Sequence, residues 1–409
     1  MRYTYAMLTN LAAEYGDAFY VLDVGRFTQN YNELLAAFRA QYEKTEIAYS
    51  YKTNYIPALC RAVNALGGYA EVVSHMEFAL ARRIGVAYEK IVFNGPYKQP
   101  EAMRELMLSG GTVHLDSLRE LELVQSIARE NPDNQLRVGI RVNFPIGDGV
   151  VSRFGFDSLG EDFQAALQMI RSSKNINMIA LHCHFASRAL ETWKPRAEGM
   201  CKILLENGLR PERIDLGGGM FGRMDERLKA QFAGEIPSYQ AYAQAVGEVL
   251  HQYWNGSYQP VLMLEPGSAL VGDCMDLVAK VHGVKTVRGQ TIATVLASTQ
   301  NIQMGSKTPP VDVVSKSPGK PYDGKPVRIV GYTCIEGDVL AKEYPGQVTV
   351  GDYAVFRNVG SYSIVLKPPF ILPNIPVLSL REDGTAEVIK RAENERDVFQ
   401  TYFTAEADA

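Results

Sequence analysis

Short β-rich runs alternate with longer amphipathic segments over the first two-thirds of the chain, and this alternation constrains the fold more than any other feature. Segments 56–66, 117–130 and 240–254 repeat apolar residues every three or four positions, which is typical of helices. Strands that alternate with helices predict a parallel sheet. The β-rich runs occupy residues 45–51, 68–74, 90–95, 112–117, 136–143, 178–185, 213–219 and 261–267.

The number of these runs favours a closed barrel. Eight parallel strands close a (β/α)₈ barrel, and the span from about residue 36 to residue 260 suits the size of that fold. An open doubly wound sheet is the alternative, but no early GxGxxG motif follows the first run. We therefore predict an α/β fold with a barrel domain over residues 26–266.

The pattern changes after Gly267. Apolar and polar residues now alternate, with few helical segments between them, which predicts an antiparallel β-domain formed by residues 1–25 and 267–409. The strand-like segment 18–24 is predicted to pair with this C-terminal sheet. Residues 305–326 are rich in Pro, Gly, Ser and Lys, so we predict an exposed loop there.

Composition excludes several classes of protein. The 409 residues include 42 Lys and Arg against 46 Asp and Glu, a net charge of -4 without a basic block, which argues against nucleic acid as a partner. No run of 18 apolar residues predicts a membrane span, and the N-terminus shows no signal peptide. Five scattered cysteines without a CxxC pattern suggest free thiols, so we expect a cytoplasmic protein.

Polar residues follow several of the predicted strands, where a barrel places its active site. Lys52 follows the first run, and an amine that is partly desolvated at a barrel mouth suits Schiff-base chemistry. An ordinary surface lysine is the alternative. The triple glycine 217–219 offers backbone N–H groups to an anion such as phosphate, although it could equally be a tight turn.

Two further features concern charge and metal binding. Glu265 ends the last run, and a buried carboxylate there needs a cationic partner, either a pyridinium nitrogen or a neighbouring Lys or Arg. His182 and His184 alternate along a predicted strand, so we expect them on opposite faces, one in the pocket and one against the helices. On that basis the sequence predicts no metal site.

Together these blocks resemble the fold-type III pyridoxal-phosphate-dependent decarboxylases, typified by diaminopimelate, ornithine and carboxynorspermidine decarboxylases. The resemblance covers nearly the whole chain. The family blocks appear in order as YSYKTN, AEVVSHME, IVFNGPYK, VHLDSLREL, VSRFGF, HCHFAS, DLGGG, EPG, CIEGD and GSYSIVL. The family implies an alanine racemase-like barrel with a β-domain, and a head-to-tail homodimer with shared active sites.

The resemblance also implies roles for individual residues. Lys52 would form the Schiff base with pyridoxal 5'-phosphate, His184 would stack on its ring, and Glu265 would hold the ring nitrogen. Cys334, entering from the partner subunit, would donate the proton to the substrate carbon. The remaining cofactor contacts implied are Glu71, Ser187, Gly217, Gly218, Gly219, Gly267 and Tyr362, and the substrate contacts are Arg153, Ile335, Glu336 and Asp338.

The chain departs from the family at three places. Ser268 replaces the arginine of the usual EPGR, which removes a phosphate or substrate contact; Arg153 and Arg188 are candidate replacements. Ile335, with Glu336 beside it, occupies the place of an acidic residue that grips a distal ammonium. The Arg-Pro-x-Leu-Tyr block is not visible near residues 305–314.

These departures argue against free diaminopimelate, ornithine or lysine as the amino-acid-type substrate. We predict a larger or differently charged amine-bearing carboxylate, such as a conjugate from siderophore or other specialised metabolism. Glu265 favours a decarboxylase over a racemase or epimerase, because racemases of this fold carry an arginine there. A non-catalytic binding protein is the other alternative, opposed by the presence of both Lys52 and Cys334.

Overall fold

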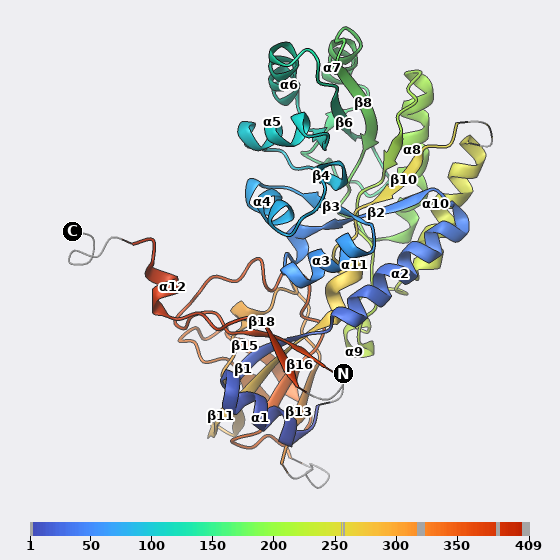
Figure 1. Ribbon diagram of the computed structural model, residues 1–409. Helices are drawn as coiled ribbons and strands as arrows, with labels where there is room; N and C mark the ends of the chain where they lie inside the picture. Colours follow the sequence, from blue (N-terminus) through green and yellow to red (C-terminus); the bar gives the residue numbers. More distant parts are fainter. Residues whose placement is uncertain (1–2, 255, 257, 317–323, 382–384, 403–409) are drawn as a thin grey trace, which may run out of the picture. The chain divides into compact units, whose positions relative to one another are not determined.

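The computed structural model describes residues 3–254, 256, 258–316, 324–381 and 385–402. The chain divides into two compact units (Figure 1). One contains residues 27–222 and 235–270, and the other contains residues 1–26, 223–234 and 271–409. We call them the barrel unit and the β-rich unit.

The barrel unit confirms the predicted (β/α)₈ architecture. Among the described residues, eight parallel strands pair side by side, and the pairing of β5 with β6 completes the circle. Every β-rich run from the sequence overlaps one of these strands, and only β8 begins before its run, at Ile176. They are β2 (Thr45–Ser50), β3 (Tyr69–Val72), β4 (Ile91–Phe93), β5 (Thr112–Leu115), β6 (Leu136–Asn143), β8 (Ile176–His182), β9 (Arg213–Asp215) and β10 (Val261–Leu264).

Helices cover the outside of the strands, as their one-sided apolar periodicity requires (Figure 1). Local sequence signals start several of them: Ser74 caps α4 by accepting a bond from the Glu77 amide, and Pro57 and Pro100 begin α3 and α5. The helices are α2 (Val24–Gln41), α3 (Pro57–Ala65), α4 (His75–Arg83), α5 (Pro100–Leu108), α6 (Leu118–Glu130), α7 (Glu161–Arg171), α8 (Trp193–Glu206), α10 (Tyr239–Tyr253) and the short α11 (Ser268–Val271).

The interior of the barrel is packed rather than open. Ala48, Tyr69, Val92 and Met263 form one buried apolar cluster. Gly139 on β6 leaves room for an imidazole, since a Cβ added there would lie 2.3 Å from Cδ2 of His114. Seven of the eight strands end one to four residues before the β-rich runs do, and β6 ends with its run, so most polar residues that close those runs lie in loops at the carboxyl edge of the barrel.

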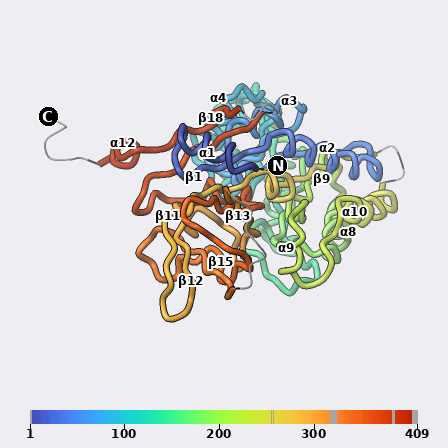
Figure 2. The backbone as a smooth tube through the Cα atoms, turned by 90° about the horizontal axis from the view of Figure 1, so that it is seen from below, coloured from blue at the N-terminus to red at the C-terminus, as the bar shows by residue number. Residues whose placement is uncertain are grey.

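The β-rich unit contains the predicted antiparallel sheet together with two parallel pairings. Strand β1 (Ala18–Leu22) pairs antiparallel with β11 (Met275–Val287) and parallel with β17 (Val377–Leu380), which confirms that the N-terminal segment joins the C-terminal sheet (Figure 2). The second parallel pair joins β12 to β14. The other strands are β12 (Gln290–Val295), β13 (Val311–Val314), β14 (Val327–Val330), β15 (Val339–Tyr344), β16 (Tyr353–Phe356) and β18 (Ala386–Lys390).

Among the described residues, three α-helices and one buried apolar cluster complete this unit. Helix α1 (Tyr5–Tyr15) buries Leu8 and Leu11 in a cluster with Phe19, Val278 and Val355. Short helices lie at Glu226–Lys229 (α9) and Glu395–Phe399 (α12). Among the described residues, no helix has both the length and the apolar character that a bilayer span requires.

The predicted loop over residues 305–326 is wrong in part. Val311–Val314 form β13, which pairs antiparallel with β16. The Pro and Lys content of the flanking residues masked a short β-branched run, and Asp312 within it pairs with Arg357 at 3.0 Å. Residues 317–323 of that predicted loop lie outside the described residues.

Candidate active site

A cavity of about 250 Å³ opens at the carboxyl edge of the barrel strands, where this fold places active sites. Its walls come from the ends of six strands and the loops that follow them. The lining residues are Lys52, Glu71, Val73, Asn94, Gly95, Pro96, Arg141, Arg153, Phe154, His182, His184 and Glu265. The cavity thus brings together five residues that the sequence predicted: Lys52, Glu71, Arg153, His184 and Glu265.

Lys52 is held at this cavity by a buried carboxylate. It lies in a single 3₁₀ turn, Tyr51–Thr53, directly after β2. Its ammonium pairs with Glu71 and donates to the Ser50 hydroxyl at 3.2 Å. Ser50 in turn donates to Glu71 at 2.6 Å, and the Asn94 amide donates to the other oxygen of Glu71 at 3.0 Å. Because Glu71 is fully buried, these partners set the position of the amine.

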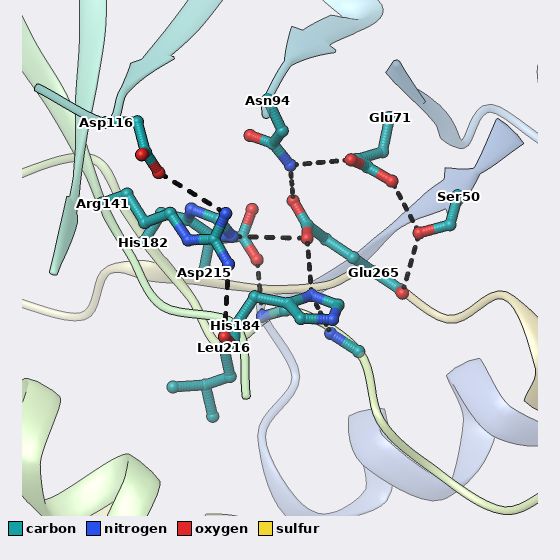
Figure 3. Close-up of polar contacts among 12 residues, drawn as sticks. Ser50, Glu71, Asn94, Asp116, Arg141, His182, His184, Asp215, Leu216 and Glu265 are labelled. Carbon is teal, nitrogen blue, oxygen red and sulfur yellow. Dashed lines mark hydrogen bonds and ion pairs between the residues drawn. The ribbon is translucent and has the colours of Figure 1, made fainter. Parts of the chain in front are cut away.

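Glu265 is a second buried carboxylate, and its partners approach it from the ends of two strands, β4 and β8 (Figure 3). The Asn94 amide donates to one oxygen, while Nε2 of His182 and Nδ1 of His184 lie 3.3 and 3.4 Å from the other. Burial alone would raise the pKa of Glu265, but the interactions with His182 and His184 outweigh it and hold this pKa well below its usual range. Glu265 is therefore an anion inside the barrel.

Two groups beside the Glu265 anion, Asp215 and His184, are uncharged. Burial, reinforced by the charge of Glu265, raises the pKa of Asp215 well above its usual value, so Asp215 is protonated. Burial lowers the pKa of His184 to about 4, which leaves its imidazole neutral at pH 7. Among the described residues, Glu265 has no Lys or Arg within ion-pair distance, so a cation in the cavity would be stabilised beside it.

The expectation that His182 and His184 occupy opposite faces is wrong. Strand β8 ends at His182, so the alternation of a strand does not extend to His184, and both rings approach the same oxygen of Glu265. The sequence argument against a metal site therefore fails as well: the ligand atoms of His114, His182, Asp215 and Glu265 lie within 4.8 Å of one another. In this structure Nε2 of His182 contacts Glu265, Asp215 accepts from the Gly217 amide at 2.9 Å, and the His114 ring stacks on the His182 ring with their centres 4.7 Å apart.

The triple glycine 217–219 forms a tight turn, which we call the glycine cradle, and it has no room for side chains. Gly217 and Gly219 have φ angles of 68° and 90°, which favour glycine. A Cβ at Gly218 would lie 2.4 Å from the carbonyl oxygen of Glu265, and one at Gly219 would lie 2.8 Å from that of Ser187. The turn therefore packs its bare backbone against the loop that contains His184 and Ser187, as an anion site requires.

A third cluster surrounds Arg141, which the sequence analysis missed because it lies inside the predicted strand. Its guanidinium lies 3.6 Å from the Asp116 carboxylate and donates to the His184 carbonyl at 3.3 Å. Asp116 also accepts from the Gly155 amide at 3.0 Å. The guanidinium of Arg153 lies 4.0 Å from the centre of the Phe154 ring. These contacts hold the loop containing Arg153 beside the cavity.

Other missed residues had weaker signals. Asn94 directly follows β4, but the predicted run extends to residue 95, so the strand-end argument that selected Lys52 did not select it. Ser50 and Asp215 likewise lie inside predicted runs, and Arg196 lies within a helix. Gly267 was expected at the cofactor; the structure shows that a Cβ there would lie 2.0 Å from Oγ1 of Thr53, so close packing requires this glycine.

The remaining predicted residues lie in the β-rich unit. Cys334 and Glu336 are exposed, Ile335 is 46% exposed, and Tyr362 is half-buried with a φ angle of 63°. Asp338 is buried, and its two oxygens accept bonds from Ser298, Thr299 and Thr333, the shortest being 2.6 Å from the Thr333 hydroxyl. That pattern gives Asp338 a structural role, and its contact with substrate stays a prediction, as do the roles of the other four.

The fold and the cavity define a barrel enzyme in which an amine and a buried carboxylate line one cavity, and a glycine turn packs against the loop that contains His184. A family model described as "Pyridoxal-dependent decarboxylase, pyridoxal binding domain" matches residues 28–272. The chain belongs to this family and is a pyridoxal-phosphate-dependent amino-acid decarboxylase.

Relatives resemble the chain over almost its whole length. A diaminopimelate decarboxylase of Methanocaldococcus jannaschii is 27% identical over 95% of this chain and 91% of its own. One of Actinosynnema pretiosum is 28% identical over 96% and 90%. The crystal structure of the M. jannaschii enzyme superposes with a TM-score of 0.87, covering 97% of this chain and 94% of its own at 24% identity, and supports the fold.

The residues present fit the cofactor. Lys52 would supply the amine for its aldehyde, and the anionic Glu265 suits a protonated ring nitrogen. The N–H groups of Gly217 and Gly218 donate to Asp215 and to Nδ1 of His184, so the N–H of Gly219 is the one that the glycine turn would offer to its phosphate. When bound, the cofactor supplies an electron-withdrawing ring that accepts the electron pair released with carbon dioxide.

Proposed function

We propose that the protein decarboxylates an amino acid or amino-acid conjugate in the cytoplasm, as a homodimer with shared active sites. The observation that carries the proposal is the ionised, buried Glu265 in the same cavity as the amine of Lys52. Lys52 holds the cofactor aldehyde, Glu265 keeps the proton on the ring nitrogen, and His184 packs against the ring. These assignments rest on the contacts described above and on the family resemblance.

Each residue has a defined part in the reaction. The bond between the substrate α-carbon and its carboxylate breaks, and carbon dioxide leaves without the bonding electrons. Cys334 of the partner subunit then donates a proton to the α-carbon and becomes a thiolate, which solvent reprotonates. An anionic Glu265 favours this outcome over racemisation, because it stabilises a positive charge on the ring nitrogen and so strengthens the electron withdrawal.

The cavity also supports a proposal for the substrate class. Arg153 lines it with its guanidinium on the Phe154 ring, while the positive charge of Arg141 is shared with Asp116. We therefore propose that Arg153, with Ile335 and Glu336 of the partner subunit, contacts the distal part of the substrate. A substrate with a distal carboxylate, such as a citrate conjugate in siderophore biosynthesis, suits this arrangement better than a distal ammonium.

Release of carbon dioxide tests the function. Purified protein with pyridoxal 5'-phosphate is offered diaminopimelate, lysine, ornithine and citrate–amine conjugates that keep a free α-amino carboxylate. Diaminopimelate is included because the relatives carry its name. We expect turnover of a conjugate and its loss in Lys52→Ala. Fast turnover of diaminopimelate would refute the substrate class, and racemisation without carbon dioxide would refute decarboxylation. Borohydride reduction and peptide mapping should find the cofactor on Lys52.

Mixing two damaged subunits tests the shared site. In the proposed dimer each cavity uses Lys52 from one subunit and Cys334 from the other, so Lys52→Ala and Cys334→Ala subunits should form one intact cavity per mixed dimer. After reassociation of an equal mixture, half of the dimers are mixed, so we expect recovery to about a quarter of wild-type turnover. The matched control mixes Lys52→Ala with Glu265→Gln, two changes in the same cavity, which should recover no more than their average.

A further inference from the structure

Arg196 is a buried arginine with an unusual environment. It projects from α8, its exposed fraction is 0%, and among the described residues it forms no ion pair with a carboxylate. Burial lowers the pKa of Arg196 to about 10, so it is still protonated at neutral pH. Removing a charge from water without a counter-ion is costly. A buried cation of this kind therefore indicates that an anion from outside the chain completes its environment.

The contacts of Arg196 show where that anion would lie. One terminal nitrogen, Nη1, donates to the Gly218 carbonyl at 2.6 Å and to the Leu216 carbonyl at 3.3 Å, and Nη2 donates to the Ser187 carbonyl at 3.3 Å. Its guanidinium carbon lies 4.2 Å from the centre of the Trp193 ring. These carbonyls belong to the loop that follows β8 and to the glycine turn that follows β9. Arg196 therefore hydrogen-bonds to both loops.

This arrangement also orients the cradle. In a trans peptide the C=O and the following N–H point in opposite directions. A Gly218 carbonyl that faces Arg196 turns the Gly219 N–H away from it, and the Ser187 carbonyl does the same for the Arg188 N–H. Arg196 therefore does two things at once: it directs backbone donors away from itself and places a positive charge behind them.

We propose that Arg196 is the positioning residue of the phosphate site and supplies the charge lost where Ser268 replaces the family's arginine. The inference rests on the assignment of Gly217–Gly219 to the cofactor phosphate. Of the candidate replacements, Arg153 stacks on Phe154, and the guanidinium of Arg188 lies 5.6 Å from the centre of the Phe221 ring. Arg196 differs from both because it hydrogen-bonds to the backbone of the cradle itself.

The test compares two ligands that differ only in phosphate. Apo-protein is titrated with pyridoxal 5'-phosphate and with pyridoxal. A unit charge several ångströms from the phosphate, in a medium of intermediate dielectric constant, is worth a factor of about 10 to 100 in affinity. Arg196→Met should therefore weaken pyridoxal 5'-phosphate by about 10- to 100-fold and leave pyridoxal within about twofold. Arg196→Lys, which keeps the charge, should restore most of the difference, and Arg188→Met is the matched control.

The outcomes separate the possibilities. Unchanged pyridoxal 5'-phosphate affinity in Arg196→Met overturns this proposal alone, and so does an equal loss of both ligands, which would show a merely structural role. A loss of phosphate preference in Arg188→Met instead would also overturn it. Wild-type protein that binds no pyridoxal 5'-phosphate would overturn the cofactor assignment as well. If Arg196→Met does not fold, as judged by circular dichroism, Arg196→Gln retains donors for the carbonyls and takes its place.

Discussion

Two buried groups at the candidate site carry charges of opposite sign. At the anionic end, in the cavity, Glu265 is an anion whose close partners are an amide and two imidazoles. At the other end, on the far side of the glycine turn, Arg196 is a cation whose partners are backbone carbonyls. Among the described residues, Glu265 has no Lys or Arg and Arg196 has no Asp or Glu within ion-pair distance, so the two ends together suit a ligand with a cationic ring and an anionic tail. The comparison shows that the sign of each buried charge predicts the opposite charge on the part of the ligand that binds there.

The strongest test of the anionic end is Glu265→Gln. The amide keeps the shape but removes the charge that stabilises a protonated ring nitrogen, so we expect turnover to fall by about 10³-fold. Thermal stability of the apo-protein should fall, because the lowered pKa of Glu265 means that the folded protein stabilises this anion. The control is Glu212→Gln, which changes an exposed carboxylate paired with Arg137 at 2.7 Å. Equal turnover in wild type and Glu265→Gln would contradict the assignment.

Gly218→Ala tests the residue that contacts both charged residues, since its carbonyl accepts from Arg196 and its Cα packs against the Glu265 backbone. Its Cβ would lie 2.4 Å from the Glu265 carbonyl oxygen, and relieving that overlap by moving backbone should cost about 1–3 kcal/mol. We expect lower stability in urea and weaker binding of both pyridoxal 5'-phosphate and pyridoxal, in contrast to the phosphate-selective effect of Arg196→Met. Gly283→Ala, where nothing lies within 4 Å of the added carbon, is the control.

The anionic end should also show a particular dependence of stability on pH. Burial lowers the pKa of His184 to about 4 from an ordinary value of 6.5, so the unfolded chain binds more protons than the folded one between these values. Stability from this group is therefore complete above pH 6.5 and is lost as the pH falls towards 4, by at most about 2 kcal/mol between pH 7 and pH 5.

Urea unfolding of apo-protein at these two pH values measures the effect. His184→Gln should lose less stability than wild type on acidification, because it removes one group whose folded form resists protonation. His251→Gln is the control, since that ring lies on the outer helix α10, where Nε2 contacts the Gln41 carbonyl oxygen at 2.6 Å. An identical pH dependence in wild type and His184→Gln would show that the imidazole is not held neutral by its surroundings.

The periodicity of apolar residues predicted most of the fold, but it placed the ends of the strands imprecisely. Each predicted β-rich run overlapped a barrel strand, because a strand that is buried on both faces has a continuous apolar sequence. The ends were overestimated, as at His184, because a loop that packs inside the barrel mouth is as apolar and as constrained as a strand. A short strand such as Val311–Val314 was lost for the opposite reason, since the residues around it resemble a loop.

The site was predicted to the extent that its chemistry lies at strand ends. The sequence by itself determined the alternating strands and helices and the presence of Lys52, Glu265 and the glycine turn after their strands, because local pattern and residue type decide these. Only the tertiary structure decided which partners hold them: Ser50 and Glu71 at the amine, Asn94 and both histidines at Glu265, and Arg196 behind the cradle. Apart from the contacts of Lys52 with Ser50 and of Arg196 with Ser187, these contacts join residues from 19 to 171 positions apart; the closure of the barrel brings them together, and no local pattern records it.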